Sequence, residues 1–181
     1  MSRTSSPSAS SAAAAPGVAP ESRAAIVCRP AATPEELAGH LSIRRRVFVE
    51  AQALFAGDDR DERDDDPATI HLVGIADGDV AGAVRLYPLD GEGRWQGDRL
   101  AVLPNARALQ LGAELVRCAV ATAGAAGGER MVALVQAQNV RFFERLGWDR
   151  DGAPTAYHGI EHQPMAIALG AAEAVRPPQA A

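Results

Sequence analysis

Residues 98–123 constrain the fold most, because they combine a strand, a tight turn and a long helix in one stretch. A short apolar run ends at Pro104, which suits a buried strand. From Leu111 the apolar residues recur at helical spacing, with Leu115 and Ala119 on the same line. A strand that feeds a helix through a short turn aims free backbone N–H groups and the positive end of the helix dipole at one point. Such a point attracts an anion, most naturally a phosphate.

Two residues of this turn strengthen the predicted anion site. Gly112 has no side chain, so a ligand can approach the backbone closely, and Arg107 can offer a guanidinium fork to phosphate oxygens. The run RLAVLPNARALQLGAELV resembles the acyl-CoA-binding motif of the GNAT acetyltransferase superfamily. Arg107 matches the first position of the family's loop and Gly112 the last, while Gln110 stands where the family usually has a glycine. An ordinary strand–helix turn with a packing glycine is the alternative interpretation.

The resemblance implies that the chain uses acetyl-CoA as co-substrate and that a defined set of residues holds it. These cofactor-binding candidates are Leu100, Ala101, Val102, Arg107, Ala108, Leu109, Gln110, Leu111, Gly112, Ala113, Asn139 and Phe143.

The charge pattern narrows the classes of function. The net charge is −5, and the segment 58–66 alone sums to −5, since it holds seven acids and two arginines. The chain contains no lysine, which excludes a lysine Schiff base and a Walker-type phosphate loop. No basic stripe indicates nucleic acid binding. The two cysteines show no metal-ligand spacing, so we expect small core residues and no metal site.

Composition also sets the expected domain organisation. Residues 1–22 are rich in Ser, Ala and Pro without an apolar run of signal-peptide length, which predicts a disordered arm and a cytoplasmic protein. Residues 23–170 are expected to form one domain, and 171–181 a loose tail. No run is long enough to span a membrane.

The order of predicted elements indicates an α/β layered domain with a mixed sheet and helices on both faces. We expect strands at 24–29, 70–76, 80–86, 95–103, 131–135, 148–150 and 155–169, and helices from Thr33 to Glu50, from Leu111 to about Gly124, and at 139–146. This is also the order of GNAT proteins, whose central sheet is mostly antiparallel.

Two further segments carry the same resemblance. NVRFFERLGW at 139–148 is similar to the second GNAT motif, with Phe142, Gly147 and Trp148 in place. Phe143 stands where the family commonly has a tyrosine whose hydroxyl is proposed to protonate the leaving thiolate, a step that phenylalanine cannot perform. The alternative role for Phe143 is core packing.

The front of the chain resembles a subset of small bacterial GNAT proteins with R-x-x-V-F-V-x-x-Q, an acidic loop and a strand starting near His. Arg44, Phe48, Gln52 and His71 fit this pattern, and residues 157–165 resemble the final hairpin G-x-x-H-x-x-M. Acyl-homoserine-lactone synthases share part of this front but usually have a tryptophan after the Phe, which is absent here.

Acyl transfer to an amine requires a base, because an alkyl amine with a pKa of roughly 10 is protonated at neutral pH. The candidate bases are Glu50, Asp98, His71 and His158. Each also has a structural interpretation: a solvated helix residue for Glu50, a strand-edge charge for Asp98, and satisfied structural histidines. The resemblance places an oxyanion donor on the backbone around Val102.

Four residues complete the candidate site as substrate contacts: Arg45, Phe48, His71 and Arg85. The acidic loop 58–66 is either a solvated loop or an attractor for a cationic amine. Residues 44–46 are expected to form a helix face, with at least one arginine paired to the acidic loop or, alternatively, an anionic substrate group bound there.

Together these observations predict an N-acetyltransferase that moves an acetyl group from acetyl-CoA to the amine of a small or amino-acid-like acceptor, by direct transfer in a ternary complex. A non-catalytic acyl-CoA sensor and an acyl-homoserine-lactone synthase are the alternatives. The expected partners are the small-molecule amine and a second copy in a homodimer, with no nucleic acid, membrane or metal.

Overall fold

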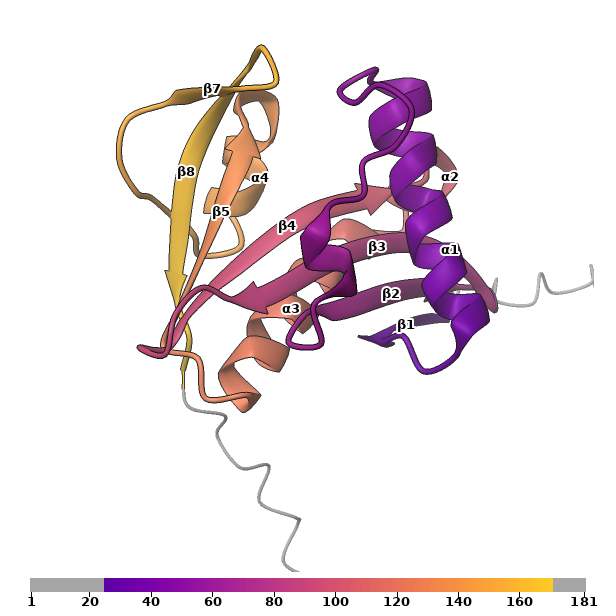
Figure 1. Cartoon of the computed structure of the whole chain (residues 1–181), viewed down its shortest axis with the longest axis horizontal. Coiled ribbons are helices and arrows are strands. Elements are labelled where there is room, and N and C mark those ends of the chain that lie inside the picture. The colour runs from indigo at the N-terminus through magenta and orange to yellow at the C-terminus, as the bar shows by residue number, and fades with distance from the viewer. Residues whose placement is uncertain (1–24, 171–181) are drawn as a thin grey trace, which may run out of the picture.

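The computed structural model describes residues 25–170, which build one eight-stranded sheet in the order β1-β2-β3-β4-β5-β8-β6, with β7 paired to β8 (Figure 1). The strands are β1 (Ile26–Pro30), β2 (Ile70–Ala76), β3 (Asp79–Pro88), β4 (Arg94–Val102), β5 (Arg130–Gln136), β6 (Asp149–Arg150), β7 (Thr155–Tyr157) and β8 (Ile160–Ala168). The helices are α1 (Pro34–Arg44), α2 (Pro104–Arg107), α3 (Leu111–Ala125) and α4 (Val140–Glu144), with the π-helical segment η1 (Arg45–Ala51) and the 3-10 helices η2 (Glu62–Asp65) and η3 (Ala137–Asn139).

The sheet is split between the neighbouring strands β4 and β5. β4 and β5 are parallel, and their register covers only Arg94–Gln96 against Arg130–Val132, whereas the other neighbours are antiparallel. Beyond that point β4 continues along β3, and β5 follows β8 as far as the pair Gln136–His162. Figure 1 shows β5 and β8 diverging from β4. The sheet therefore divides into a larger leaf, β1 to β4, and a smaller leaf, β5 to β8, with a V-shaped split between them.

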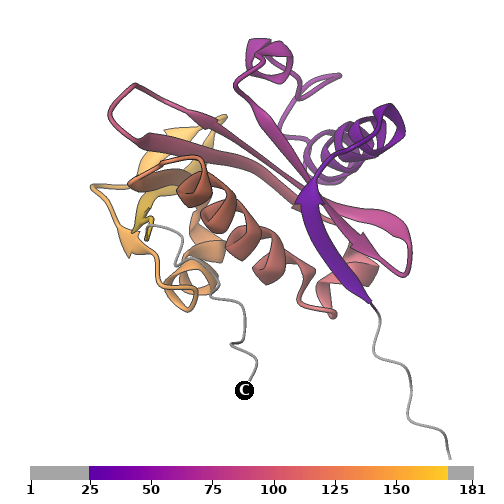
Figure 2. The same ribbon diagram turned by 90° about the horizontal axis from the view of Figure 1, so that it is seen from below.

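Helices cover both faces of the larger leaf (Figure 2). Thr33 caps α1 by accepting a hydrogen bond from the Glu36 amide, and Pro34 opens the first turn. On the opposite face α3 packs Leu111 and Leu115, both fully buried, against β2 and β3. A Cβ at Gly82 would lie 2.7 Å from a Leu115 methyl, so this glycine lets the helix approach closely.

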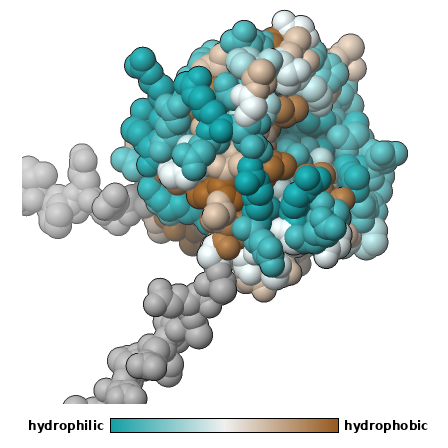
Figure 3. All heavy atoms as spheres, turned by 90° about the vertical axis from the view of Figure 1, so that its left-hand side faces the viewer, coloured by the Kyte–Doolittle hydropathy of each residue, from teal (hydrophilic) through white to brown (hydrophobic). Residues whose placement is uncertain are grey.

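Two apolar clusters fill the space on either side of the sheet. The larger lies on the α3 face and includes Leu72, Leu86 and Met131; the smaller lies on the α1 face around Ile43 and Phe48. The face of the smaller leaf seen in Figure 3 is mostly hydrophilic, with apolar side chains gathered near its middle.

The sequence prediction of a mixed sheet with helices on both faces is confirmed, with differences at two places. The predicted helix from Thr33 to Glu50 becomes α-helical only to Arg44 and then continues as a π-helical segment, η1, because its hydrogen bonds widen before the chain turns at Ala53 (φ 51°). The predicted turn after β4 contains the short helix α2. The predicted arm at 1–22 and the tail at 171–181 lie outside the described residues.

Gly128 provides a test of close packing at the base of the split. A Cβ there would lie 2.6 Å from Trp95 Cδ1 and 2.8 Å from the Ala123 carbonyl oxygen, which is backbone and cannot move aside. We expect Gly128→Ala to lower the free energy of unfolding by roughly 1–3 kcal/mol in urea denaturation. The matched control is Gly91→Ala, where a Cβ meets nothing within 4 Å; equal stability of the two variants would contradict this packing argument.

Candidate active site

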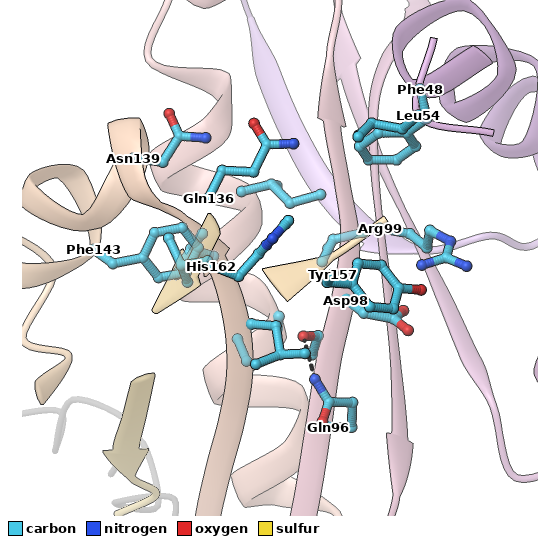
Figure 4. Close-up of a pocket in the computed structure, with 18 of the residues that line it drawn as sticks. Phe48, Leu54, Gln96, Asp98, Arg99, Gln136, Asn139, Phe143, Tyr157 and His162 are labelled. Atoms are coloured by element: carbon cyan, nitrogen blue, oxygen red, sulfur yellow. Dashed lines mark hydrogen bonds between the residues drawn. The ribbon is translucent and has the colours of Figure 1, made fainter. Parts of the chain in front are cut away.

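A cavity of about 290 Å³ occupies the split between β4 and β5 (Figure 4). Its outer part is walled by η1 and the loop that follows, by the β7–β8 hairpin and by the ends of β4 and β5. Its inner part is lined by buried apolar side chains from the α3 face of the sheet. The cavity therefore passes through the opening that the short β4–β5 pairing creates.

The cavity brings together six of the residues selected from the sequence, although they come from distant parts of the chain. They are Phe48, Asp98, Leu100, Asn139, Phe143 and His158. Figure 4 shows Phe143 and Asn139 on one side of the cavity, opposite Phe48 and Asp98.

The other thirteen candidates lie outside the lining of this cavity, and eight of them, Val102 and residues 107–113, belong to the predicted anion loop and the strand end before it. Glu50 and Arg45 pair with each other at 3.3 Å, and both side chains are more than half exposed. Ala101 is buried on the α1 face beside Ile43. His71 and Arg85 belong to a polar cluster beneath α1.

Arg85 is the centre of this polar cluster. Its side chain is 1% exposed, and its guanidinium reaches Asp61 at 2.5 Å, Asp64 at 3.0 Å and Asp98 at 2.8 Å. Two parallel hydrogen bonds join it to the two carboxylate oxygens of Asp98. Carboxylates thus surround this guanidinium, which anchors the acidic loop and Asp98, and the predicted contact of Arg85 with substrate stays a prediction.

The acidic loop is partly folded into the protein. Asp59 and Asp64 have side chains only 1% exposed, and both pair with the fully buried Arg44 of α1. Burial opposes ionisation of Asp64, but hydrogen bonds from Arg44 and from the Asp61 amide outweigh it and hold the pKa of Asp64 well below its usual range. The expected pairing of one arginine from 44–46 with this loop is confirmed for Arg44.

His71 lies against the same cluster and contacts a second buried histidine. Its Nδ1 is 3.3 Å from His40 Nε2, and its Nε2 is 3.2 Å from the Asp64 carbonyl oxygen. Burial lowers the pKa of His40 to about 3, so that ring is neutral, and burial also lowers the pKa of His71. The structure gives His71 contacts within the fold, and its predicted roles as base and substrate contact stay predictions.

The strand β4 is irregular where it borders the cavity. The register with β3 shifts between the pairs Ala83–Ala101 and Arg85–Asp98, and Arg99 has a left-handed backbone (φ 54°). A bulge of this kind leaves backbone groups unpaired and turns side chains toward a site. Arg99 lines the cavity, stacks 4.7 Å over the Phe55 ring and pairs with Asp61 at 3.1 Å.

The predicted anion loop lies next to β4 and α4, two elements that line the cavity. Gln110 adopts φ 61° immediately before α3, which is the backbone conformation that favours glycine. A Cβ on Gly112 would lie 3.7 Å from both Val102 at the end of β4 and Phe142 of α4. Arg107 is exposed, and its Nε donates to the Val102 carbonyl at 3.2 Å. The loop thus sits between β4 and α4, at the mouth of the split.

The sequence analysis did not select His162 and Tyr157, which line the cavity from the β7–β8 hairpin (Figure 4). His162 is 5% exposed, and its Nδ1 is 2.9 Å from the Ile160 carbonyl. Since a carbonyl can only accept, Nδ1 carries the proton and Nε2 is left as an acceptor in the neutral ring. The G-x-x-H-x-x-M resemblance contained His162, and only its position in the hairpin distinguishes it from His158.

A hydrogen bond closes the outer part of the split. The Gln136 amide at the end of β5 donates to the Gln52 side-chain oxygen at 3.0 Å, and both side chains line the cavity. This contact joins the smaller leaf to the end of η1. A ligand lying along the split would pass next to it.

The family assignment rests on the sequence of residues 41–148, which match the model of the acetyltransferase (GNAT) family. The chain belongs to the GNAT family. It is therefore an acyltransferase of the N-acetyltransferase class, and the sequence-based family prediction is confirmed. No curated protein sequence matches the chain significantly.

Solved structures share this fold at low sequence identity. A Lactobacillus plantarum protein described as an N-acetyltransferase is 21% identical with a TM-score of 0.71, covering 80% of this chain and 99% of its own. An aminoglycoside 6'-N-acetyltransferase complexed with coenzyme A is 17% identical with a TM-score of 0.66, covering 79% and 97%. The acyl-homoserine lactone synthase BjaI is 18% identical with a TM-score of 0.64, covering 81% and 84%.

Residues 25–170 hold no group of three or more His, Cys, Asp or Glu side chains arranged for a metal ion. Within that same range no helix combines the length and apolar character needed to cross a bilayer.

The depressed pKa of Asp64 predicts a pH-dependent stability. A carboxylate whose folded-state pKa is lowered contributes stability that is present above the unfolded pKa of about 3.9 and is lost as pH falls toward the folded value. We expect the free energy of unfolding to decrease as the pH falls below about 4. Asp64→Asn should make this decrease smaller. At neutral pH the variant should be less stable by about 3–5 kcal/mol, because Arg44 loses its buried partner.

Denaturant titrations across pH 2–8 measure this effect. Asp65→Asn is the matched control, since the Asp65 side chain is 80% exposed and pairs with Arg60 at the surface. The argument fails if Asp64→Asn and Asp65→Asn give the same stability and the same pH profile.

Proposed function

We propose that the protein transfers an acyl group from acyl-CoA, with acetyl-CoA as the simplest donor, to the amine of a small or amino-acid-like molecule. The observation that carries this proposal is the cavity in the β4–β5 split, since β4 and α4 line it and also flank the loop preceding α3. One extended acyl-CoA molecule could then place its phosphates at the start of α3 and its thioester in the split. We also propose a cytoplasmic location, where acyl-CoA is available.

The chain's own residues fit coenzyme A at the loop. The first backbone N–H groups of a helix as long as α3 have no partners within the helix and suit a pyrophosphate. Arg107 is exposed at the same loop and can add its charge. Gln110 already holds the left-handed backbone that a glycine would adopt, at a cost of about 1–3 kcal/mol. The replacement of glycine therefore preserves the loop's shape, which supports binding.

His162 is the base that the geometry favours. Its Nδ1–H is fixed on the Ile160 carbonyl, so Nε2 faces the cavity as a proton acceptor. Asp98 accepts two hydrogen bonds from Arg85 and is already charge-paired, which makes it a poorer acceptor for an ammonium proton. His158 packs between the rings of Phe55 and Tyr157 and is the second candidate.

Direct transfer needs two further groups from the chain. The bulge at Arg99 and Leu100 offers backbone N–H donors at the cavity wall for the developing oxyanion, slightly earlier in β4 than the predicted position around Val102. Phe143 packs edge-on against Trp148 and has no proton to give. The Tyr157 hydroxyl lines the same cavity and is the group we assign to protonate the leaving thiolate.

The loop assignment is tested by isothermal titration of acetyl-CoA and free CoA. We expect micromolar binding to the intact chain and at least tenfold weaker binding, about 1.4 kcal/mol, to the double variant Arg107→Ala, Gly112→Asp, because charge and backbone access are lost. The control carries the same two changes at the opposite end of β4, as Arg94→Ala, Gly91→Asp. Absence of binding to the intact chain would refute the donor assignment.

The base assignment is tested by thiol release from acetyl-CoA over a panel of small amines. We expect His162→Gln to lower kcat by about 10²–10⁴ with little change in the KM for acetyl-CoA, since proton removal and donor binding use different groups. His158→Gln is the matched variant on the same hairpin. Full activity of His162→Gln with loss in His158→Gln would move the base to His158.

A further inference from the structure

The inner part of the cavity forms a chamber on the α3 side of the sheet. We define this inner chamber by Val84, Val116, Ala119, Met131, Ala133 and Trp148. Each of these side chains is less than 9% exposed, and none carries a charge. They come from β3, α3, β5 and the segment after α4, so the chamber lies within the main core, directly behind the vertex of the split.

One polar group in this chamber has no partner. Trp148 is 3% exposed, and its indole Nε1–H makes no hydrogen bond to any of residues 25–170. Its ring stacks edge-on against Phe143 at 5.3 Å, which fixes the ring beside the cavity. A buried N–H without an acceptor is costly, and such groups are uncommon in native proteins. The indole N–H is therefore a donor that a bound ligand can use.

Small side chains keep the chamber open. Ala119 and Ala133 present single methyl groups where α3 and β5 could carry larger apolar residues. Gly97 stands at the vertex, where a Cβ would lie 3.3 Å from the Met131 sulfur. An empty apolar space in a core loses contacts on all its walls. An acetyl group held at the β4 bulge adds only one methyl beyond the thioester carbonyl and would leave this space vacant.

We propose that the inner chamber binds the acyl chain of donors longer than acetyl, and that Trp148 donates a hydrogen bond to an uncharged oxygen on that chain. This rests on the proposed function, because it assumes an acyl-CoA in the split. The oxygen is a hydroxyl or a keto group, since an unpaired carboxylate among these apolar walls would lose its hydration without compensation. The transfer chemistry itself is unchanged.

The test compares thiol release from acetyl-CoA, butanoyl-CoA and 3-hydroxybutanoyl-CoA with one amine acceptor. For the intact chain we expect kcat/KM to rise from acetyl to butanoyl and again to 3-hydroxybutanoyl. Ala119→Leu fills the chamber, so the butanoyl-to-acetyl ratio of kcat/KM should fall at least tenfold. Trp148→Phe removes the donor but keeps an aromatic ring, so the hydroxybutanoyl-to-butanoyl ratio should fall about fivefold, as expected for one hydrogen bond.

Ala125→Leu makes the same change on an exposed position of α3 and should leave both ratios as in the intact chain. Equal ratios in the intact chain and Ala119→Leu, with acetyl-CoA turned over normally, would overturn the inner chamber proposal while the proposed function stands. An unchanged hydroxybutanoyl-to-butanoyl ratio in Trp148→Phe would overturn the role of the indole.

If no donor is turned over, titration calorimetry tests the inner chamber proposal separately from the proposed transferase function. Tighter binding of butanoyl-CoA than of acetyl-CoA, lost in Ala119→Leu, would then support the inner chamber and refute only the transferase proposal. Equal binding of both donors to both chains would refute the inner chamber as well.

Discussion

The buried ion pairs around Arg85 are the interaction on which the site depends. Arg85 projects from the middle of the sheet and holds Asp61 and Asp64 of the acidic loop together with Asp98 of β4. Buried charges are tolerated only when they are paired, so the loop is drawn onto the α1 face and its position is fixed by the sheet. Because Asp98 pairs with Arg85 and Arg99 pairs with Asp61, the same network sets one wall of the cavity.

The cavity itself follows from incomplete strand pairing. Parallel strands need a crossover connection, and α3 supplies it between β4 and β5. Only three residue pairs join these strands, so beyond Gln96 and Val132 the edges of β4 and β5 that face each other can line a site. The helix that makes the connection possible also brings its N-terminal loop to the open end of the split. Chain topology thus places the predicted anion loop and the cavity next to each other.

Local patterns predicted most of this frame. The β2–β3 hairpin, α3 and the strand β5 carry strong periodicity and turn residues, and the structure has them at nearly the expected bounds. The pairing of Asp64 with Arg85 could not be predicted, because it joins residues more than twenty positions apart in the chain. The same limit applies to His162 and His158, which differ in burial and in a carbonyl that fixes one ring.

The limited pairing between the two leaves has a consequence for the lifetime of the protein. Strand pairing joins the two leaves through three residue pairs, and the outer gap is spanned by the Gln136–Gln52 hydrogen bond and the Phe55–His158 ring contact. A molecule bound in the gap replaces the missing strand contacts and couples its own affinity to folding, by about 2.7 kcal/mol at a hundredfold excess over Kd. In a cell, the supply of such a molecule would then regulate how long each copy escapes degradation, so metabolic state would set protein abundance.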